Sequence, residues 1–253
     1  MTSFTERVRS GSPTLGTFLN LGSTLAAEVC ALSGFDFLLV DLEHGAGGED
    51  ALVSQILAGA AHDVPVIVRT ESAERIRAGR VLDLGALGVM FPRLDTPEEV
   101  ASAVGHLSYP PRGDRGIAGL NRARRFGSDA RSSHEVNESI LSIVQIETLA
   151  ALEDVETIAA TAGVDVLFVG PSDLSAAMGI PGQLDAPDFL TALDQVVEAC
   201  RRAKKVAGIF IAYPDRVPAL VRRGFNFNVV GSDSSLLSAA AKAAASGQSD
   251  AVA

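Results

Sequence analysis

Two carboxylates follow apolar segments of this chain at a spacing that could build a cation site. Glu147 ends the run LSIVQIE, and Asp173 follows VDVLFVGPS 26 residues further on. This separation is about one strand-plus-helix unit of an α/β barrel, so parallel neighbouring strands would bring both acids to one end of the sheet. Carboxylate oxygens converging on an open face favour a divalent cation with room left for substrate. Each acid taken singly is also consistent with a helix cap.

Two further side chains stand at expected strand ends and could complete the site. Arg69 directly follows PVIV, and His44 follows DFLLVDLE. The guanidinium suits a substrate carboxylate, and the alternative is an intramolecular ion pair with Glu147 or Asp41. His44 is either a general base or an ordinary surface histidine. With the two acids, these residues predict metal-dependent aldol cleavage of a 2-oxo acid, in which the cation stabilises an enolate and His44, or water it holds, moves the proton.

The segments that would position these side chains alternate between short apolar runs and longer amphipathic ones. The apolar runs are continuous, as in parallel strands that are buried on both faces. Eight such strands with intervening helices predict a single (β/α)8 TIM barrel over residues 1–253, and a doubly wound open sheet is the alternative. The expected strands are 14–19, 36–41, 65–69, 87–91, 141–147, 165–170, 206–212 and 226–231.

Two stretches depart from this alternation of apolar and amphipathic segments. Residues 107–140 are polar, rich in Gly, Pro and Arg, and far longer than an ordinary connection. They form either a surface insertion or a functional loop, over the barrel mouth or at a subunit contact.

The last residues, 246–253, are expected to be a flexible tail. Between the strands, Thr96 followed by Pro97 and two glutamates is typical of a helix start.

The composition limits the class of protein. Apolar residues make up 47% of the chain and charged residues 21%, which is enough for a substantial core. The net charge of −10 argues against nucleic-acid binding, because no basic field would collect phosphates. Cys30 and Cys200 are isolated from other metal-ligand residues, which fits a reducing compartment. No signal peptide or membrane span is evident, so we expect a cytoplasmic protein.

The lysines argue against covalent amine catalysis. The chain has three, namely Lys204, Lys205 and Lys242, and none lies in an apolar strand. A Schiff-base lysine of a barrel aldolase would have to project inward from such a strand and be desolvated. We therefore expect a metal ion, and no Schiff-base lysine, at the site.

The motifs taken together resemble the HpcH/HpaI aldolase family, in particular its class II pyruvate aldolases, which cleave 4-hydroxy-2-oxo acids. The resemblance runs from about residue 5 to 245 and rests on GFDFLLVDLEH, VPVIVR, YPPRGDRG, VQIET and GVDVLFVGPSDLSAAMG, in that order. It implies a metal-dependent lyase of aromatic or sugar acid catabolism that gives pyruvate and an aldehyde. It also implies a homo-oligomer, a trimer or hexamer, whose last helix packs on a neighbouring subunit.

The resemblance also implies a role for each matching residue. Glu147 and Asp173 would hold Mg²⁺, Mn²⁺ or Co²⁺, Arg69 would bind the pyruvyl oxygen, and His44 would serve as, or position, the base. Backbone amides in the turn Gly170-Pro171-Ser172-Asp173 would hold the substrate carboxylate, and Gln145 would line the pocket. Phe18 stands where familiar members of the family carry a tryptophan, which could alter the room for the aldehyde.

Asp83 matches the acid that partners the histidine in the family. A residue just before the strand at 87–91 belongs at the opposite end of its own barrel, however. A neighbouring subunit or a bent connection would be needed to bring Asp83 to His44, and the alternative is that it merely ends a helix. Arg122, Arg124 and Arg125 are similarly open to two interpretations, as partners of a distal substrate carboxylate or of a neighbouring subunit.

Other functions remain as alternatives. The same machinery could act on acyl-CoA substrates, as in the related citryl- and malyl-CoA lyases, although no nucleotide site is evident. A barrel that binds 2-oxo acids without turnover is a second alternative. A phosphate-binding isomerase is a third, for which IAYPD and VVGSDSS after the last two strands give a partial match.

Overall fold

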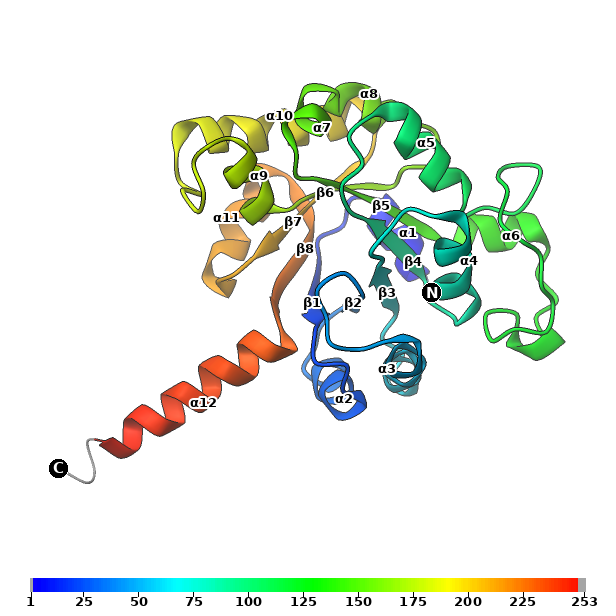
Figure 1. Cartoon of the computed structure of the whole chain (residues 1–253), viewed down its shortest axis with the longest axis horizontal. Helices are drawn as coiled ribbons and strands as arrows, with labels where there is room; N and C mark the ends of the chain where they lie inside the picture. The colour runs from blue at the N-terminus through cyan, green and yellow to red at the C-terminus, as the bar shows by residue number, and fades with distance from the viewer. Residues whose placement is uncertain (1, 250–253) are drawn as a thin grey trace.

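The computed structural model describes residues 2–249 and contains a closed barrel of eight parallel strands (Figure 1). Each strand pairs with the next one along the chain, and β8 closes the barrel against β1. The predicted (β/α)8 fold is therefore confirmed, and the open-sheet alternative is wrong. The strands are β1 (Thr14–Leu19), β2 (Phe37–Asp41), β3 (Val66–Arg69), β4 (Gly88–Phe91), β5 (Leu141–Ile146), β6 (Val166–Val169), β7 (Val206–Ile211) and β8 (Phe225–Ser232).

The strands are apolar on both faces because each face packs against other side chains. In β2, Phe37 and Leu39 belong to the cluster inside the barrel, whereas Leu38 and Val40 belong to the layer beneath the helices. All four are at most 2% exposed. Inside the barrel, Phe37 stacks on Phe227 of β8 with ring centroids 4.4 Å apart. The two layers fix the strand ends, and with them the residues that reach the mouth.

Helices surround the barrel and return the chain to the start of each following strand. The helix α5 begins as predicted, since the Thr96 side chain accepts from the backbone N–H of Glu99 and Pro97 takes its first position. Within the described residues, no helix is both long and apolar enough to cross a membrane. The main helices are α2 (Thr24–Leu32), α3 (Glu49–Ala61), α4 (Arg75–Asp83), α5 (Pro97–Gly105), α7 (Leu149–Glu153), α8 (Val155–Ala160), α9 (Pro171–Ala177), α10 (Pro187–Ala203) and α11 (Val217–Arg223).

A short N-terminal helix that the sequence analysis did not predict, α1 (Phe4–Arg9), covers the amino end of the barrel. Phe4 packs on Phe37 inside the barrel, with ring centroids 5.6 Å apart. Arg9 donates from Nε to Oδ1 of Asp165, just before β6, at 2.8 Å. These contacts fill the amino end, so the carboxyl ends of the strands form the mouth.

The long segment 107–140 also lies at the amino end. It connects α5 to β5 and includes a 3₁₀ turn, η1 (Arg125–Gly127), and the helix α6 (Ser133–Ser139). Thr5 of α1 donates from Oγ1 to the carbonyl of Ser139 at 2.8 Å. The idea that this loop covers the mouth of its own barrel is therefore wrong, because a connection from a helix to the next strand must end where that strand begins. The remaining interpretations of this loop are a surface insertion and a subunit contact.

The last helix, α12 (Asp233–Ser249), projects away from the barrel (Figure 1). Only its beginning packs against β1, β8 and α2. Residues 246–249, the first part of the tail that the sequence predicts to be flexible, continue this helix. Residues 250–253 lie outside the described part of the chain.

Candidate active site

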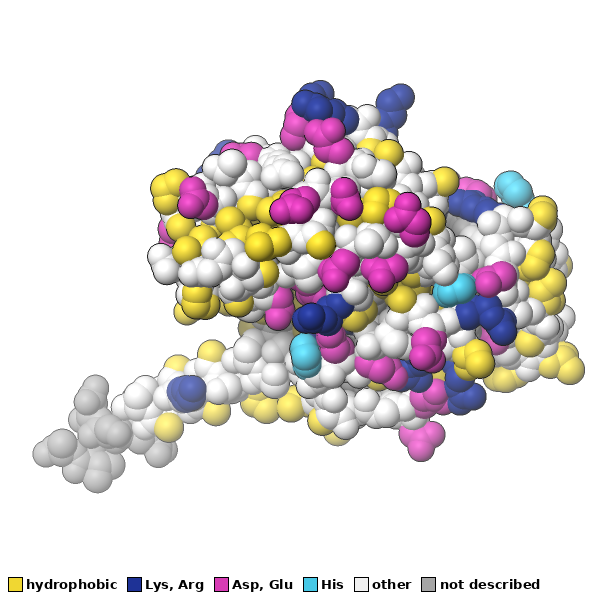
Figure 2. Space-filling model, turned by 45° about the horizontal axis from the view of Figure 1, so that its top comes forward, with side chains coloured by type: hydrophobic (Ala, Val, Ile, Leu, Met, Phe, Trp, Pro, Cys, Tyr) yellow, Lys and Arg dark blue, Asp and Glu magenta, His cyan; other side chains and the backbone are white. Residues whose placement is uncertain are grey.

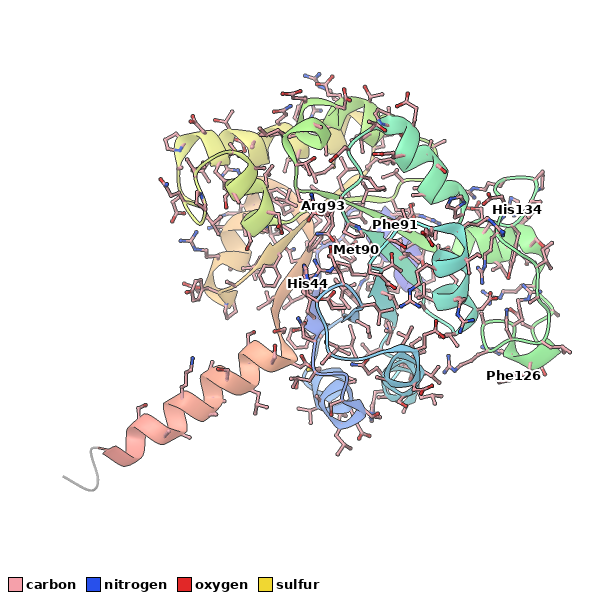
Figure 3. All side chains as sticks on the ribbon, viewed as in Figure 1. His44, Met90, Phe91, Arg93, Phe126 and His134 are labelled. Carbon is pink, nitrogen blue, oxygen red and sulfur yellow. The ribbon has the colours of Figure 1, made fainter. Side chains whose placement is uncertain are left out.

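A cavity of about 330 Å³ opens at the mouth of the barrel and collects residues from most of the strand ends. Figure 3 shows His44 and Arg93 near the centre of the molecule, whereas Phe126 of the long loop lies at its periphery. Most of the predicted site residues line this cavity. The lining residues are Phe18, Asn20, Asp41, His44, Arg69, Gln145, Phe168, Gly170, Pro171, Ser172, Asp173, Phe210 and Ser232.

Glu147 lies at the base of this site, directly after β5, and is only 5% exposed. One carboxylate oxygen accepts from the backbone N–H of Arg93 at 2.8 Å, and the other accepts from Nε2 of Gln145 at 2.8 Å. Burial raises the pKa of Glu147; the Arg93 N–H lowers it in part, and the charges of Asp173 and Glu43 raise it further. An acid kept buried beside other acids is suited to a bound cation.

Asp173 approaches Glu147 through a tight turn between β6 and α9. Pro171 occupies the first position of α9, and Asp173 lies in its first turn, exposed to solvent. Gly170 permits the close approach, because a Cβ atom there would lie 2.9 Å from Oε2 of Glu147. The first-turn amides of Ser172 and Asp173 have no carbonyl four residues back within the helix to bond. The turn therefore presents a carboxylate and free N–H groups to the same cavity.

The two carboxylates fit a divalent cation that keeps open coordination positions. Among residues 2–249, no three His, Cys, Asp or Glu side chains converge as a complete protein cage would require. Magnesium-like ions commonly take one or two protein carboxylates and complete their shell with water and substrate. The acids Asp41, Glu43, Glu147 and Asp173 share this region with the guanidinium of Arg69. The excess of negative charge at the mouth would be offset by a dication.

Arg69 is oriented by Asp41, its neighbour on the adjacent strand. The register of β2 and β3 places the two residues opposite each other. Arg69 donates from Nε and Nη2 to the two oxygens of Asp41, at 2.9 and 2.7 Å, and Asp41 is 1% exposed. Its Nη1 lies 3.2 Å from Glu43, and its guanidinium lies 4.8 Å from the centre of the Phe18 ring. The ion-pair interpretation was therefore correct for Asp41, while the guanidinium still lines the cavity.

His44 lies on the rim of the cavity, and Asp83 of the same chain does not contact it. Its side chain is 67% exposed, and Nε2 is 3.7 Å from Oε2 of Glu43. Its backbone N–H donates to Oδ1 of Asp41 at 3.2 Å, so the same acid fixes the His44 loop and Arg69. Asp83 ends α4 and accepts from Nη2 of Arg115 at 2.7 Å. Within one chain, the predicted pair of His44 and Asp83 does not form.

Several cavity residues were not assigned a role from the sequence. Asp41 was considered only as an ion-pair partner, yet it contacts Arg69 and two loop amides. Phe168 and Phe210 join Phe18 in the apolar part of the cavity, and the rings of Phe18 and Phe210 are 5.8 Å apart. Inward alternation along β6 and β7 could have indicated both. The lysines Lys204, Lys205 and Lys242 all lie in the described residues, and none lines the cavity.

The fold and this mouth define the chain as a (β/α)8-barrel enzyme, and comparison with known proteins gives its family. The model of the HpcH/HpaI aldolase/citrate lyase family matches residues 14–240, so the chain belongs to that family. It is 40% identical to a hydroxypyruvate/pyruvate aldolase of Paraburkholderia phytofirmans, with 92% of this chain and 94% of that protein aligned. A 4-hydroxy-2-oxovalerate aldolase of Rhodococcus jostii is 37% identical, with 93% and 91% aligned.

The structural comparison agrees with this assignment. The crystal structure of an HpcH/HpaI aldolase/citrate lyase family protein from Burkholderia cenocepacia superposes with a TM-score of 0.92 at 37% identity. The match covers 97% of this chain and 98% of that one. The chain is therefore an aldolase, a carbon–carbon lyase of the retro-aldol type.

Proposed function

We propose that this aldolase is divalent-metal-dependent and cleaves a 4-hydroxy-2-oxo acid to pyruvate and an aldehyde. The observation that carries the proposal is that buried Glu147 lies beside Gly170 and within the electrostatic influence of Asp173, at the cavity that Asp173 and Arg69 line. Glu147 and Asp173 would hold Mg²⁺, Mn²⁺ or Co²⁺. When bound, the cation supplies Lewis-acid polarisation of the 2-oxo group. The side chains and backbone amides around the cavity would bind the substrate and transfer the proton.

Arg69 orients the pyruvyl half of the substrate. Because Asp41 holds Nε and Nη2, the guanidinium at the cavity is fixed in direction, with its Nη1 3.2 Å from Glu43. The positive charge favours electron density that develops on the 2-oxo oxygen during cleavage. The amides of Ser172 and Asp173 would hold the carboxylate, and Gln145 keeps Glu147 in place through its Nε2 bond.

We propose that His44 transfers the proton. In the cleavage direction, His44 or a water that it holds takes the proton of the 4-hydroxyl, and C4 becomes the aldehyde carbonyl. The electrons of the C3–C4 bond pass to C3, which then takes a proton to give the methyl group of pyruvate. The 67% exposure of the His44 side chain leaves it free to meet an acid partner from outside the chain. We propose that Asp83 of a neighbouring subunit is that partner.

Metal removal tests the proposed function. Treatment with EDTA is expected to abolish release of pyruvate from a 4-hydroxy-2-oxo acid, and Mn²⁺, Co²⁺ or Mg²⁺ should restore it. The reason is that arginine and amide donors alone give no Lewis acid at the 2-oxo group. The measurement is lactate dehydrogenase-coupled oxidation of NADH. Full cleavage activity in the chelated and dialysed enzyme would contradict the proposal.

We also propose that the chain forms a homo-oligomer, a trimer or hexamer, through α12. An apolar groove of about 520 Å³ runs between α2 and the start of α12, and Val29 and Leu237 line it. Leu25, Val29 and Leu32 form a helical stripe on α2 that is 64–72% exposed. Figure 2 shows hydrophobic side chains along the projecting helix and beside its base. A neighbour's α12 would cover the stripe that this chain's own helix leaves open.

The oligomer predicts a change in molar mass for two substitutions. Val29→Lys and Leu237→Lys are each expected to lower the mass measured by light scattering after size exclusion, because each would bury a charge in the groove. Leu149→Lys is the control, since Leu149 is an exposed leucine on α7, away from the groove. A wild-type mass of one chain, or a mass that neither groove substitution lowers, would contradict this interface.

A further inference from the structure

One residue at the mouth of the barrel adopts a backbone conformation that few side chains tolerate. Arg93 follows β4 at the carboxyl end of that strand, and its φ of +52° lies in the left-handed region. Residues of this kind persist where the surrounding structure holds them, and they cluster at functional sites. The other non-glycine residues with positive φ within residues 2–249 all lie in connections that lead to the amino ends of strands, and they are Asp63, Arg125, Phe126 and Lys204.

The backbone of Arg93 contacts the proposed cation site. Its N–H donates to Oε1 of Glu147 at 2.8 Å, just beyond the paired part of β4 and β5. Nε2 of Gln145 donates to the other oxygen, Oε2, at 2.8 Å. A carboxylate has about four lone-pair positions on its two oxygens, so each oxygen keeps one for a cation. The two donors therefore fix the direction in which Glu147 presents its remaining lone pairs.

The turn around Arg93 is held in place by its neighbours. The residues on both sides of Arg93 are buried, and Leu94 packs in the layer beneath the helices. Oδ1 of Asp95 accepts from Oγ1 of Thr148, the residue directly after Glu147, at 2.6 Å. The turn after β4 is thus bonded to the end of β5 at two points, one through Arg93 and one through Asp95.

The side chain of Arg93 makes no comparable contact. It is exposed, and its guanidinium forms no hydrogen bond or ion pair within residues 2–249. A left-handed backbone costs free energy at any residue other than glycine, and no contact of this side chain offsets that cost. The contacts that hold the conformation are therefore the buried neighbours and the bond from the backbone N–H to Glu147.

We infer that Arg93 is a positioning residue for Glu147, and that it acts through its left-handed backbone, which aims the N–H at Oε1, and not through its guanidinium. The inference rests on the proposed function, in which Glu147 holds a divalent cation, and adds the turn that orients this acid. Loss of a partner that orients a metal ligand typically weakens metal binding by roughly 10–100-fold.

Three substitutions of Arg93 separate the backbone from the side chain, because all three remove the guanidinium and its charge. Valine is β-branched and tolerates a positive φ poorly, whereas asparagine and glycine adopt it readily. Arg93→Val is expected to weaken Mn²⁺ binding to the full-length, EDTA-treated protein, measured by calorimetry, by about tenfold or more. Arg93→Asn and Arg93→Gly should bind Mn²⁺ at least as tightly as the wild type does, because the N–H keeps its direction and a positive charge is lost.

Lys204→Val is the matched control for Arg93→Val. Lys204 ends α10 with a φ of +57°, and it does not line the mouth. Both substitutions should lower Tm, because valine is strained at either position, but Lys204→Val should leave the affinity for Mn²⁺ unchanged. Equal affinities in Arg93→Val and Arg93→Asn, an equal loss in Arg93→Val and Arg93→Gly, or an equal loss in Arg93→Val and Lys204→Val would overturn the inference.

Hydrogen exchange of residues 93–96 in the metal-free protein separates this inference from the proposed function, because it needs no cation. These backbone amides are expected to exchange faster in Arg93→Val than in the wild type, and at about the wild-type rate in Arg93→Asn. The same pattern in a protein that binds no Mn²⁺ would contradict the metal-dependent function while supporting the positioning of Glu147. Exchange in Arg93→Val at the wild-type rate would overturn the positioning role.

Discussion

Glu147→Gln is expected to lower kcat/KM for retro-aldol cleavage by about 10³-fold, since Lewis-acid stabilisation of several kcal/mol would be lost with the cation. The substitution keeps the size of the side chain and an oxygen for the Arg93 N–H. It removes one negative charge from the proposed cation site and places a second amide beside Nε2 of Gln145. Affinity for Mn²⁺, measured by calorimetry, should fall together with activity.

The control for this substitution is Glu153→Gln on α7. Glu153 is an exposed glutamate at the end of its helix, so the change alters net charge equally without touching the mouth. Its activity and Mn²⁺ affinity are expected to match those of the wild type. A Glu147→Gln enzyme that keeps activity within tenfold, or binds Mn²⁺ normally, would exclude Glu147 as a ligand.

Arg69→Lys is expected to lower kcat by about 10²-fold, the magnitude typical of losing one preorganised donor to developing negative charge. Lysine keeps the charge but cannot reproduce the two parallel bonds to Asp41 together with the third contact, at Glu43. Steady-state kinetics with one 4-hydroxy-2-oxo acid measures the effect. Because Asp41 acts through Arg69, the loss in the double variant with Asp41→Asn should be smaller than the product of the two single losses.

The chain offers a matched control for Arg69. Arg223 donates from Nε and Nη2 to the two oxygens of Asp194, which is the same bidentate arrangement outside the mouth. Arg223→Lys should leave kcat unchanged. If Arg69→Lys were as active as Arg223→Lys, the arginine at the mouth would serve the fold alone.

Much of the fold could be predicted because the strands are apolar on both faces. Continuous runs such as LSIVQIE have no solvent face, and a strand buried on both sides must lie in a covered parallel sheet. Once the strands are assigned, the rule that polar residues at carboxyl ends form the site selects Glu147, Asp173, Arg69 and His44. The cavity at the mouth contains three of these and lies directly beside Glu147.

Pairings between strands were harder to predict, because they depend on register. The sequence left Arg69 with two acid partners, and only the pairing of β2 with β3 selects Asp41 over Glu147. The position of the loop at 107–140 could have been found, since it follows a helix and precedes a strand. Asp83 lies at the amino end of the barrel, as expected for a residue just before β4. Its partner Arg115, however, comes from the loop at 107–140. Contacts between distant segments of this kind have no local signal.

Exchange of the methyl protons of pyruvate in D₂O, followed by NMR, tests the central claim most directly, because it needs the pyruvyl half of the site and no aldehyde. We predict exchange in the presence of Mn²⁺ or Co²⁺, no exchange after EDTA, and none above background in Glu147→Gln. We also predict that borohydride with pyruvate leaves the enzyme active, because no lysine lines the cavity among the described residues. Exchange that persists without a divalent cation, or inactivation by borohydride trapping, would contradict a metal-dependent pyruvate aldolase.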